Sequence, residues 1–137
     1  NASPCGNSAA LAAFLRHSAV TGDEASQAQI DTVLERFVPL MEGAPRFASW
    51  ALAQAEAHHA GPMQIAIVGT AGSELHRVAL AQSALGAVVV VGTEGTDVPL
   101  FAQRTRQGGK DTAYVCRNFT CELPVTDPEA LAAQLSN

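Results

Sequence analysis

Hydrophobic residues recur at helical spacing from the start of the chain. The first set predicts a helix that begins near Asn7 or Ser8 and stops at Gly22, because glycine readily takes the left-handed conformation that ends a helix. Its inward positions are Leu11, Phe14, Leu15, Ser18 and Ala19.

A second series has the cleanest helical spacing in the chain, and it predicts a face that is buried along its whole length. Its members are Ile30, Val33, Leu34, Phe37, Val38 and Met41. Pro39 falls inside the series, so we expect the helix to kink or end near Val38.

A third helix is predicted from Pro45 to Gly61-Pro62, with one face formed by Phe47, Trp50, Ala51, Ala55 and His58. Three amphipathic helices are too few to close a bundle around such large apolar faces. They require a further layer of structure.

The spacing changes at Met63. The run Met63–Val68 is short, apolar and β-branched, and helical spacing returns after Ser73, the expected N-cap, with Leu75, Val78 and Ala79 inward. The next run, Ala87–Val91, predicts a strand that is buried on both faces. Strand, helix and strand of these lengths favour a right-handed βαβ unit.

The remaining pattern predicts four further elements. These are a short helix from Val98 to Arg104, a strand from Thr112 to Cys116, a second extended stretch near Phe119–Leu123 that pairs back on it, and a last helix. The stretch Thr126-Asp127-Pro128-Glu129 resembles a capping box with proline in the first turn, and the helix it opens should reach Leu135.

Together these elements predict an α/β fold of two parts. Residues 3–61 form a helical segment, and residues 62–137 form a small α/β lobe with a βαβ-containing sheet of three or four strands and covering helices. The boundary lies near Gly61-Pro62, where the spacing of apolar residues changes.

Composition and charge limit the classes of function that the chain can have. Charged residues make up only 15% of the chain, against about 25% in an average globular domain, so some of the surface is expected to face protein. The net charge of −5 argues against nucleic-acid binding. Four basic residues cluster late in the chain: Arg104, Arg106, Lys110 and Arg117. We interpret this cluster as part of a solvated loop around Gly108-Gly109, and an anion-binding patch is the alternative. No apolar run approaches the ~18 residues of a membrane span.

The start of the chain and the number of cysteines bear on the cellular location of the protein. Asn1–Pro4 has neither the basic start nor the apolar stretch of a signal peptide, and the absence of an initiator Met suggests a piece of a longer protein. Three cysteines are few and odd in number for a secreted disulfide scaffold, so we expect a reducing, cytoplasmic location.

Cys116 and Cys121 are the redox candidates. If a four-residue loop, Arg117–Thr120, joins the strands, the cysteines face each other and a disulfide is feasible. If the turn is only Arg117-Asn118, they lie diagonally at ~7–8 Å and cannot bridge without movement. Arg117 is the one obvious neighbour that would favour a thiolate. We favour reduced structural thiols, and a disulfide or metal ligation remain alternatives.

The turn Gly69-Thr70-Ala71-Gly72-Ser73 is a second candidate site. Backbone N–H groups between a strand and a helix can hold an anion, so Gly69, Thr70, Gly72 and Ser73 are candidates for binding a small anion or nucleotide. The spacing matches neither GxGxxG nor a P-loop. A structural βα turn is the favoured interpretation.

The sequence gives little support for a metal site or for a catalytic cysteine. No second cysteine pair or HxxxH completes a metal site, and we expect no metal or cofactor. Cys5 has no context typical of a nucleophile, and the spacing of His17, His58, His59 and His76 does not establish a dyad with it. We therefore expect no catalytic residues in this chain.

The C-terminal stretch from Thr112 to Leu131 closely resembles the extreme C-terminus of thioredoxin-domain-containing proteins similar to spermatogenesis-associated protein 20. Its most specific part is Thr112-Ala113-Tyr114-Val115-Cys116-Arg117-Asn118-Phe119-Thr120-Cys121. The opening Ser3–Ser8 also resembles that family's Pro-Ser-Gly-Asn-Ser stretch, with Cys5 where Ser is usual, and Ile65–Gly69 matches in position. The stretch between Val91 and Gly109 is shorter than in the family.

This resemblance implies that the opening helices are the end of an α/α toroid like that of six-hairpin glycosidases, and that a thioredoxin-like domain precedes it. The partner would then be the N-terminal remainder of the polypeptide. We expect a non-catalytic structural and interaction module, which self-associates when alone because its helical faces lack their partner. A thiol redox accessory at Cys116 and Cys121 and an anion site at Gly69–Ser73 are the alternatives.

Overall fold

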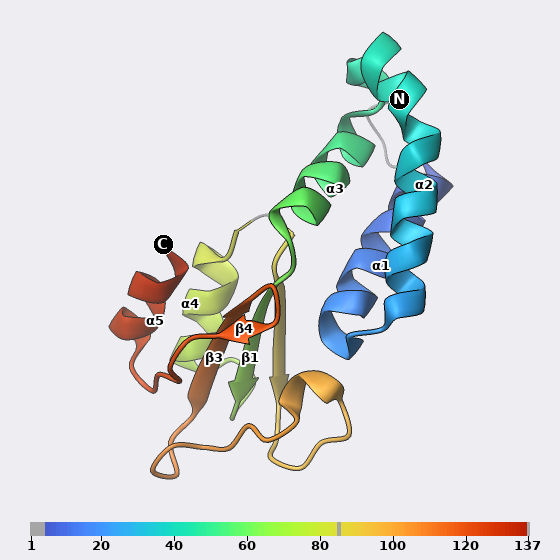
Figure 1. Ribbon diagram of the computed structural model, residues 1–137. Helices are drawn as coiled ribbons and strands as arrows, with labels where there is room; N and C mark the ends of the chain where they lie inside the picture. Colours follow the sequence, from blue (N-terminus) through green and yellow to red (C-terminus); the bar gives the residue numbers. More distant parts are fainter. Residues whose placement is uncertain (1–4, 85, 137) are drawn as a thin grey trace. The chain divides into compact units, whose positions relative to one another are not determined.

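The computed structural model describes residues 5–84 and 86–136, and it has the α/β fold predicted from the sequence (Figure 1). Five α-helices and a four-stranded mixed sheet are present in these residues. The chain divides into two compact units, Asn1–Gly61 and Pro62–Asn137. We call them the helical unit and the α/β unit, and describe each by itself.

The helical unit contains α1 (Gly6–Thr21), α2 (Glu24–Gly43), the short 3-10 helix η1 (Pro45–Phe47) and α3 (Ser49–Ala60). α1 ends as expected at Gly22, which has a φ of 73°. The next residue, Asp23, caps α2 by accepting hydrogen bonds from the backbone N–H groups of Ala25 and Ser26. This tight connection sets α1 and α2 against each other.

Two expectations for the second helix are wrong: an end near Val38, and burial of the apolar face along its whole length. α2 continues through Pro39 to Gly43, since proline removes only one backbone donor and the remaining turns of the helix still form. Its apolar face is also not buried along its length, because only Ser26 and Ile30 are buried. None of the apolar side chains of α2 after Ile30 is buried, and those of Val38 and Leu40 are exposed.

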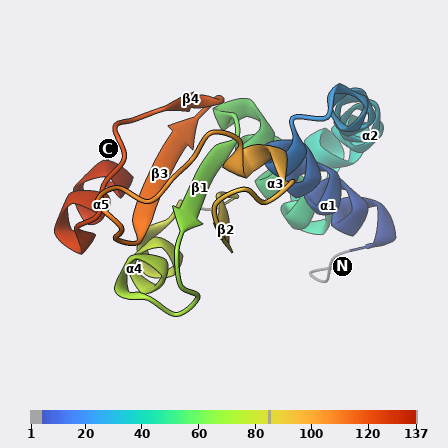
Figure 2. The same ribbon diagram turned by 90° about the horizontal axis from the view of Figure 1, so that it is seen from below.

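The α/β unit is built on the strand order β2-β1-β3-β4 (Figure 2). β1 (Met63–Val68) pairs in parallel with β2 (Val88–Gly92) through the crossover helix α4 (Glu74–Gln82), which confirms the βαβ unit. β3 (Thr112–Arg117) pairs antiparallel with β1 on its other side, and the two-residue strand β4 (Thr120–Cys121) pairs antiparallel with β3. The sheet is therefore mixed.

One face of this sheet carries the core. α4 and the last helix, α5 (Pro128–Leu135), pack together and cover it (Figure 2). Alternation along a strand sends every second side chain to this face. The buried residues that meet there are Ile65, Ile67, Leu75, Ala79, Ala113, Val115, Leu131 and Leu135.

The sequence patterns misplaced three details of this unit. β2 lies at an edge of the sheet and is only partly buried, so the expectation of burial on both faces is wrong. The helix expected from Val98 to Arg104 is only the 3-10 turn η2 (Pro99–Phe101). The cap of α5 is Asp127, one residue later than the capping-box pattern suggested, because its carboxylate accepts from the N–H of Ala130.

Candidate thiol–disulfide site

The β3–β4 hairpin places Cys116 and Cys121 directly opposite each other. Asn118 and Phe119 form the turn with φ of 51° and 61°, the two positive values of the type I′ turn that suits a two-residue hairpin. Arg117 and Thr120 pair next to the turn, and the N–H of Glu122 donates to the carbonyl of Val115. The cysteines thus occupy the non-hydrogen-bonded position between these pairs, where side chains lie closest.

The structure contains a disulfide between Cys116 and Cys121, whose Cα atoms are 3.9 Å apart. Our first interpretation, two reduced structural thiols, is therefore not the state seen here. The shorter turn at Arg117-Asn118 is wrong because the turn lies one residue later. The cysteines face each other, as the longer connection required.

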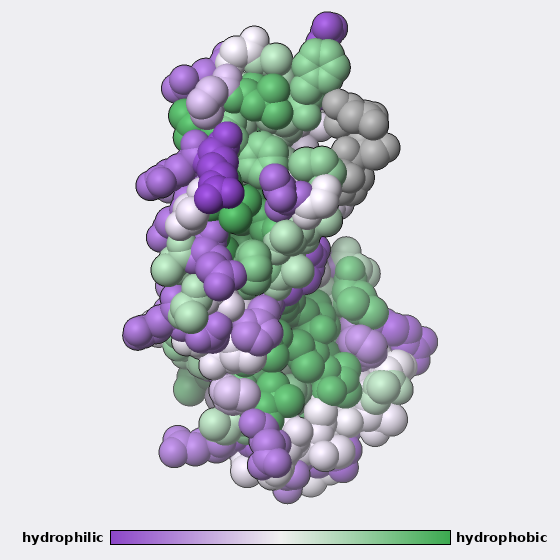
Figure 3. Space-filling model, turned by 90° about the vertical axis from the view of Figure 1, so that its right-hand side faces the viewer, coloured by the Kyte–Doolittle hydropathy of each residue, from purple (hydrophilic) through white to green (hydrophobic). Residues whose placement is uncertain are grey.

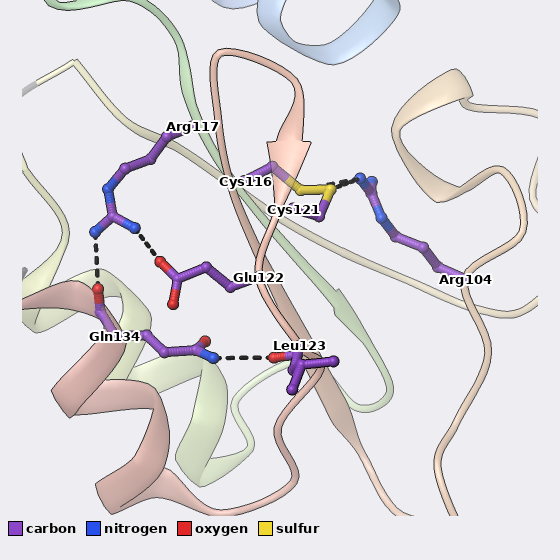
Figure 4. Close-up of a disulfide and its surroundings, with 7 residues drawn as sticks. All are labelled: Arg104, Cys116, Arg117, Cys121, Glu122, Leu123 and Gln134. Atoms are coloured by element: carbon purple, nitrogen blue, oxygen red, sulfur yellow. Dashed lines mark hydrogen bonds and ion pairs between the residues drawn. A yellow bond between two sulfur atoms is a disulfide. The ribbon is translucent and has the colours of Figure 1, made fainter.

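Arg104 binds this disulfide from a loop twelve residues away in sequence (Figure 4). Its Nη2 donates to both sulfurs, Cys116 Sγ and Cys121 Sγ, at 3.1 Å each. The guanidinium carbon lies 5.6 Å from the ring centre of Tyr114. Desolvation by burial lowers the pKa of Arg104, but an arginine side chain stays protonated in proteins, so the sulfurs have a cation beside them.

Arg117, which the sequence offered as the charged neighbour of the cysteines, does not contact them. Successive side chains of a strand point to opposite faces, so Arg117 and Cys116 diverge. The Arg117 guanidinium pairs with Glu122 and donates to the carbonyl of Gln134 in α5 (Figure 4). Arg104 reaches the sulfurs instead because it follows η2, which lies against β1.

The two sulfur-bearing residues differ in exposure. Cys116 is only 1% exposed, whereas Cys121 is an exposed residue of the edge strand β4. A dissolved thiol can therefore approach Cys121 more readily than Cys116.

The predicted anion loop has its backbone donors engaged within the chain. The N–H of Thr70 donates to the Asp111 carboxylate, and the N–H of Gly72 donates to Nδ1 of His76. A Cβ on Gly69 would collide with Asp111, so glycine is needed there for this carboxylate to approach. Asp111 and His76 thus take up backbone donors that an external anion would need.

Two other residues of this region have local roles. Ser73 caps α4, as predicted, by accepting from the N–H of His76. Arg106 pairs with Asp111 at 3.0 Å. The basic cluster expected around Gly108-Gly109 is thus not simply a solvated loop, because three of its four members have defined partners.

Cys5 is a free thiol at the start of α1. A hydrogen bond with the Ser8 side chain is the main cause of its lowered pKa. The described hydrogen bonds of His17 and His58 go to Ser26 and Asp31, so neither forms a dyad with Cys5.

Residues 5–84 and 86–136 show neither a metal-binding cluster nor a membrane-spanning helix. They contain no group of three or more His, Cys, Asp or Glu side chains placed to hold a metal ion. None of their helices combines the length and the apolar character required to cross a membrane.

The helical unit offers a second surface of interest, which we call the apolar patch. It comprises the exposed large apolar side chains that line one pocket: Leu40, Phe47 and Trp50. A pocket of about 230 Å³ opens among them, lined by Cys5, Ser8, Phe37, Leu40, Phe47, Ala48, Trp50 and Ala51. Figure 3 shows apolar side chains, coloured green, at the surface on the side where α2 lies.

No model of a known protein family, no curated protein and no solved structure matches this chain significantly.

Proposed function

We propose that this chain is a non-catalytic structural and interaction module whose helical unit binds a protein partner through the apolar patch. The observation that carries this proposal is the exposure of three large apolar side chains, Leu40, Phe47 and Trp50, around one pocket. Contiguous apolar surface of this kind, with a pocket among its side chains, is typical of protein contact sites. The low charged fraction of 15% supports the same conclusion.

The partner we propose is the remainder of a longer polypeptide, in which α1, α2 and α3 complete an α/α toroid. This extends the resemblance to thioredoxin-domain-containing proteins, which stays a prediction. Nucleic acid is not proposed as a partner, since the net charge is −5. A membrane is not proposed either, and none of the described helices could span one. In the absence of the partner, the patch is expected to drive self-association.

Light scattering over a concentration series tests this proposal. The chain is expected to associate reversibly at micromolar concentrations, and Leu40→Ser should weaken association about tenfold, since losing one buried leucine contact costs about 1.4 kcal/mol or more. Leu80→Ser is the matched control, because Leu80 on α4 is 60% exposed and Leu40 is 40% exposed. A monodisperse monomer at all concentrations, or equal effects of both variants, would count against the patch.

A second candidate function is a thiol redox accessory that uses Cys116 and Cys121. The observation that favours it is the hydrogen bonding of Arg104 to both sulfurs, since a cation stabilises the thiolate that opens or closes a disulfide. We propose a cytoplasmic location, in which such a bond would be transient. Free thiols counted in glutathione buffers should change by two per chain as the buffer is made more oxidising.

A further inference from the structure

We propose that the Cys116–Cys121 disulfide is opened in one direction: an incoming thiol attacks Cys121, and Cys116 departs as a thiolate held by Arg104. This inference rests on the thiol redox function proposed above as the second candidate. It adds the identity of the attacked sulfur, the role of each cysteine, and the chemical class of the reductant, a dithiol.

Exposure decides which sulfur is attacked. The attacking thiolate must approach along the line of the S–S bond, from behind the sulfur that it will bind. Cys121 lies on the exposed edge strand β4, whereas Cys116 is 1% exposed on β3. The approach to Cys121 is thus the open one.

Arg104 favours departure of the other sulfur. As the S–S bond breaks, its electron pair remains on Cys116 Sγ, which becomes an anion. The Arg104 Nη2 already lies 3.1 Å from that atom, so the charge develops beside a fixed donor and cation. Because the same nitrogen lies 3.1 Å from Cys121 Sγ as well, Arg104 stabilises the leaving thiolate, whereas exposure sets the direction. A lower pKa of the departing thiol speeds exchange. The Tyr114 ring, 5.6 Å from the guanidinium carbon, helps to hold the group in place.

The complete reaction transfers two electrons from the dithiol. Its first thiolate bonds to Cys121 Sγ and forms a mixed disulfide, while Cys116 leaves as the thiolate. The dithiol's second thiolate then attacks the dithiol's first sulfur, which is bonded to Cys121 Sγ in the mixed disulfide. Cys121 leaves as a thiolate and takes up a proton. The dithiol becomes a disulfide, Cys121 a thiol, and Cys116 a thiolate paired with Arg104.

The 137-residue chain carrying Cys5→Ser, which removes the third thiol, allows a direct test. The oxidised protein is treated briefly with glutathione, the released thiol is alkylated with iodoacetamide, and the protein is digested with trypsin. Cleavage after Lys110 and Arg117 separates the two cysteines into different peptides. Glutathione is expected on the peptide that begins at Asn118, and the alkyl group on Asp111–Arg117. The reverse labelling would overturn the proposed direction.

Variants at two arginines test the thiolate-holding role. Arg104→Gln should slow reduction by glutathione about tenfold, because the departing thiolate loses its cation, and Arg104→Lys should restore part of the rate. Arg117→Gln is the matched control, since Arg117 adjoins Cys116 in sequence but binds Glu122 and Gln134. Circular dichroism checks that each variant folds. Equal rates for Arg104→Gln and Arg117→Gln would overturn the role of Arg104.

The same samples separate failure of this inference from failure of the redox function. If the Cys5→Ser chain keeps two free thiols in oxidised glutathione, no reversible disulfide forms, and both the function and this inference fall. If the disulfide forms but labelling is reversed or equal at the two cysteines, the function stands and the inference alone is wrong.

Discussion

The two units of this protein use their apolar residues differently. In the α/β unit, α4 and α5 cover one face of the sheet, and the large aliphatic side chains of β1 and β3 meet them in a buried core. In the helical unit, α2 is the longest helix, but Ile30 is its one buried large apolar residue. Its second half leaves Leu40 exposed, where it lines one pocket with Phe47 and Trp50.

This difference shows that helical spacing alone does not establish burial within a chain. The α2 pattern is as regular as that of a core helix, but α1, η1 and α3 cover its C-terminal half only in part. A partner would cover the rest. The α/β unit also has exposed large apolar residues, Leu80, Phe119 and Leu123, but they lie on α4, in the hairpin turn and after β4 rather than around one pocket.

The largest expected effect comes from truncating one apolar side chain in each unit. Ile65→Ala, in the core of the α/β unit, should lower the free energy of unfolding by about 3 kcal/mol, because it leaves a cavity. Leu40→Ala in the apolar patch should change it by less than about 0.5 kcal/mol in the monomer. Urea unfolding followed by circular dichroism at low protein concentration measures both. Similar losses of unfolding free energy in the two variants would contradict the difference in burial between the two units.

Alanine at two glycines should give effects of opposite sign. Gly69→Ala in the α/β unit places a methyl group against Asp111, so the bond from Thr70 is lost and stability should fall by about 1–2 kcal/mol. Gly43→Ala at the end of α2 meets no neighbouring atom and should raise stability by about 0.5 kcal/mol, since alanine is the better helix former. Thermal unfolding of both variants measures the difference, and a loss at both sites would contradict it.

The smallest effect concerns pH in the helical unit. Hydrogen bonding to Ser26 is the main cause of the lowered pKa of Asp23, so its carboxylate contributes stability above the ordinary pKa of 3.8. That contribution is lost as pH falls through the still lower pKa of the folded state. The stability difference between the natural chain and Asp23→Asn should therefore shrink on acidification. A difference that is constant from neutral pH to pH ~2 would show that charge on the cap does not matter.

Much of the fold follows from local sequence, whereas the site depends on topology. Gly22 predicted the end of α1, and Ser73 predicted the start of α4. The apolar run Met63–Val68 predicted β1. These signals could be interpreted because each acts over only a few residues. The facing cysteines were predicted only as one of two alternatives, since a shift of the turn by one residue changes their pairing. Strand alternation could have excluded Arg117 from the sulfurs. Arg104 could not be found, because its place depends on how the loop after η2 lies against β3 and β4.

Amide hydrogen exchange across residues 38–52 tests the central claim most directly. It compares this chain at low concentration with the longer polypeptide that we propose contains it. The account predicts that exchange in residues 38–52 slows at least about tenfold in the longer polypeptide, while the core strands β1 and β3 stay equally protected in both. Equal exchange of residues 38–52 in the two proteins would contradict the proposal that the apolar patch is covered by a partner.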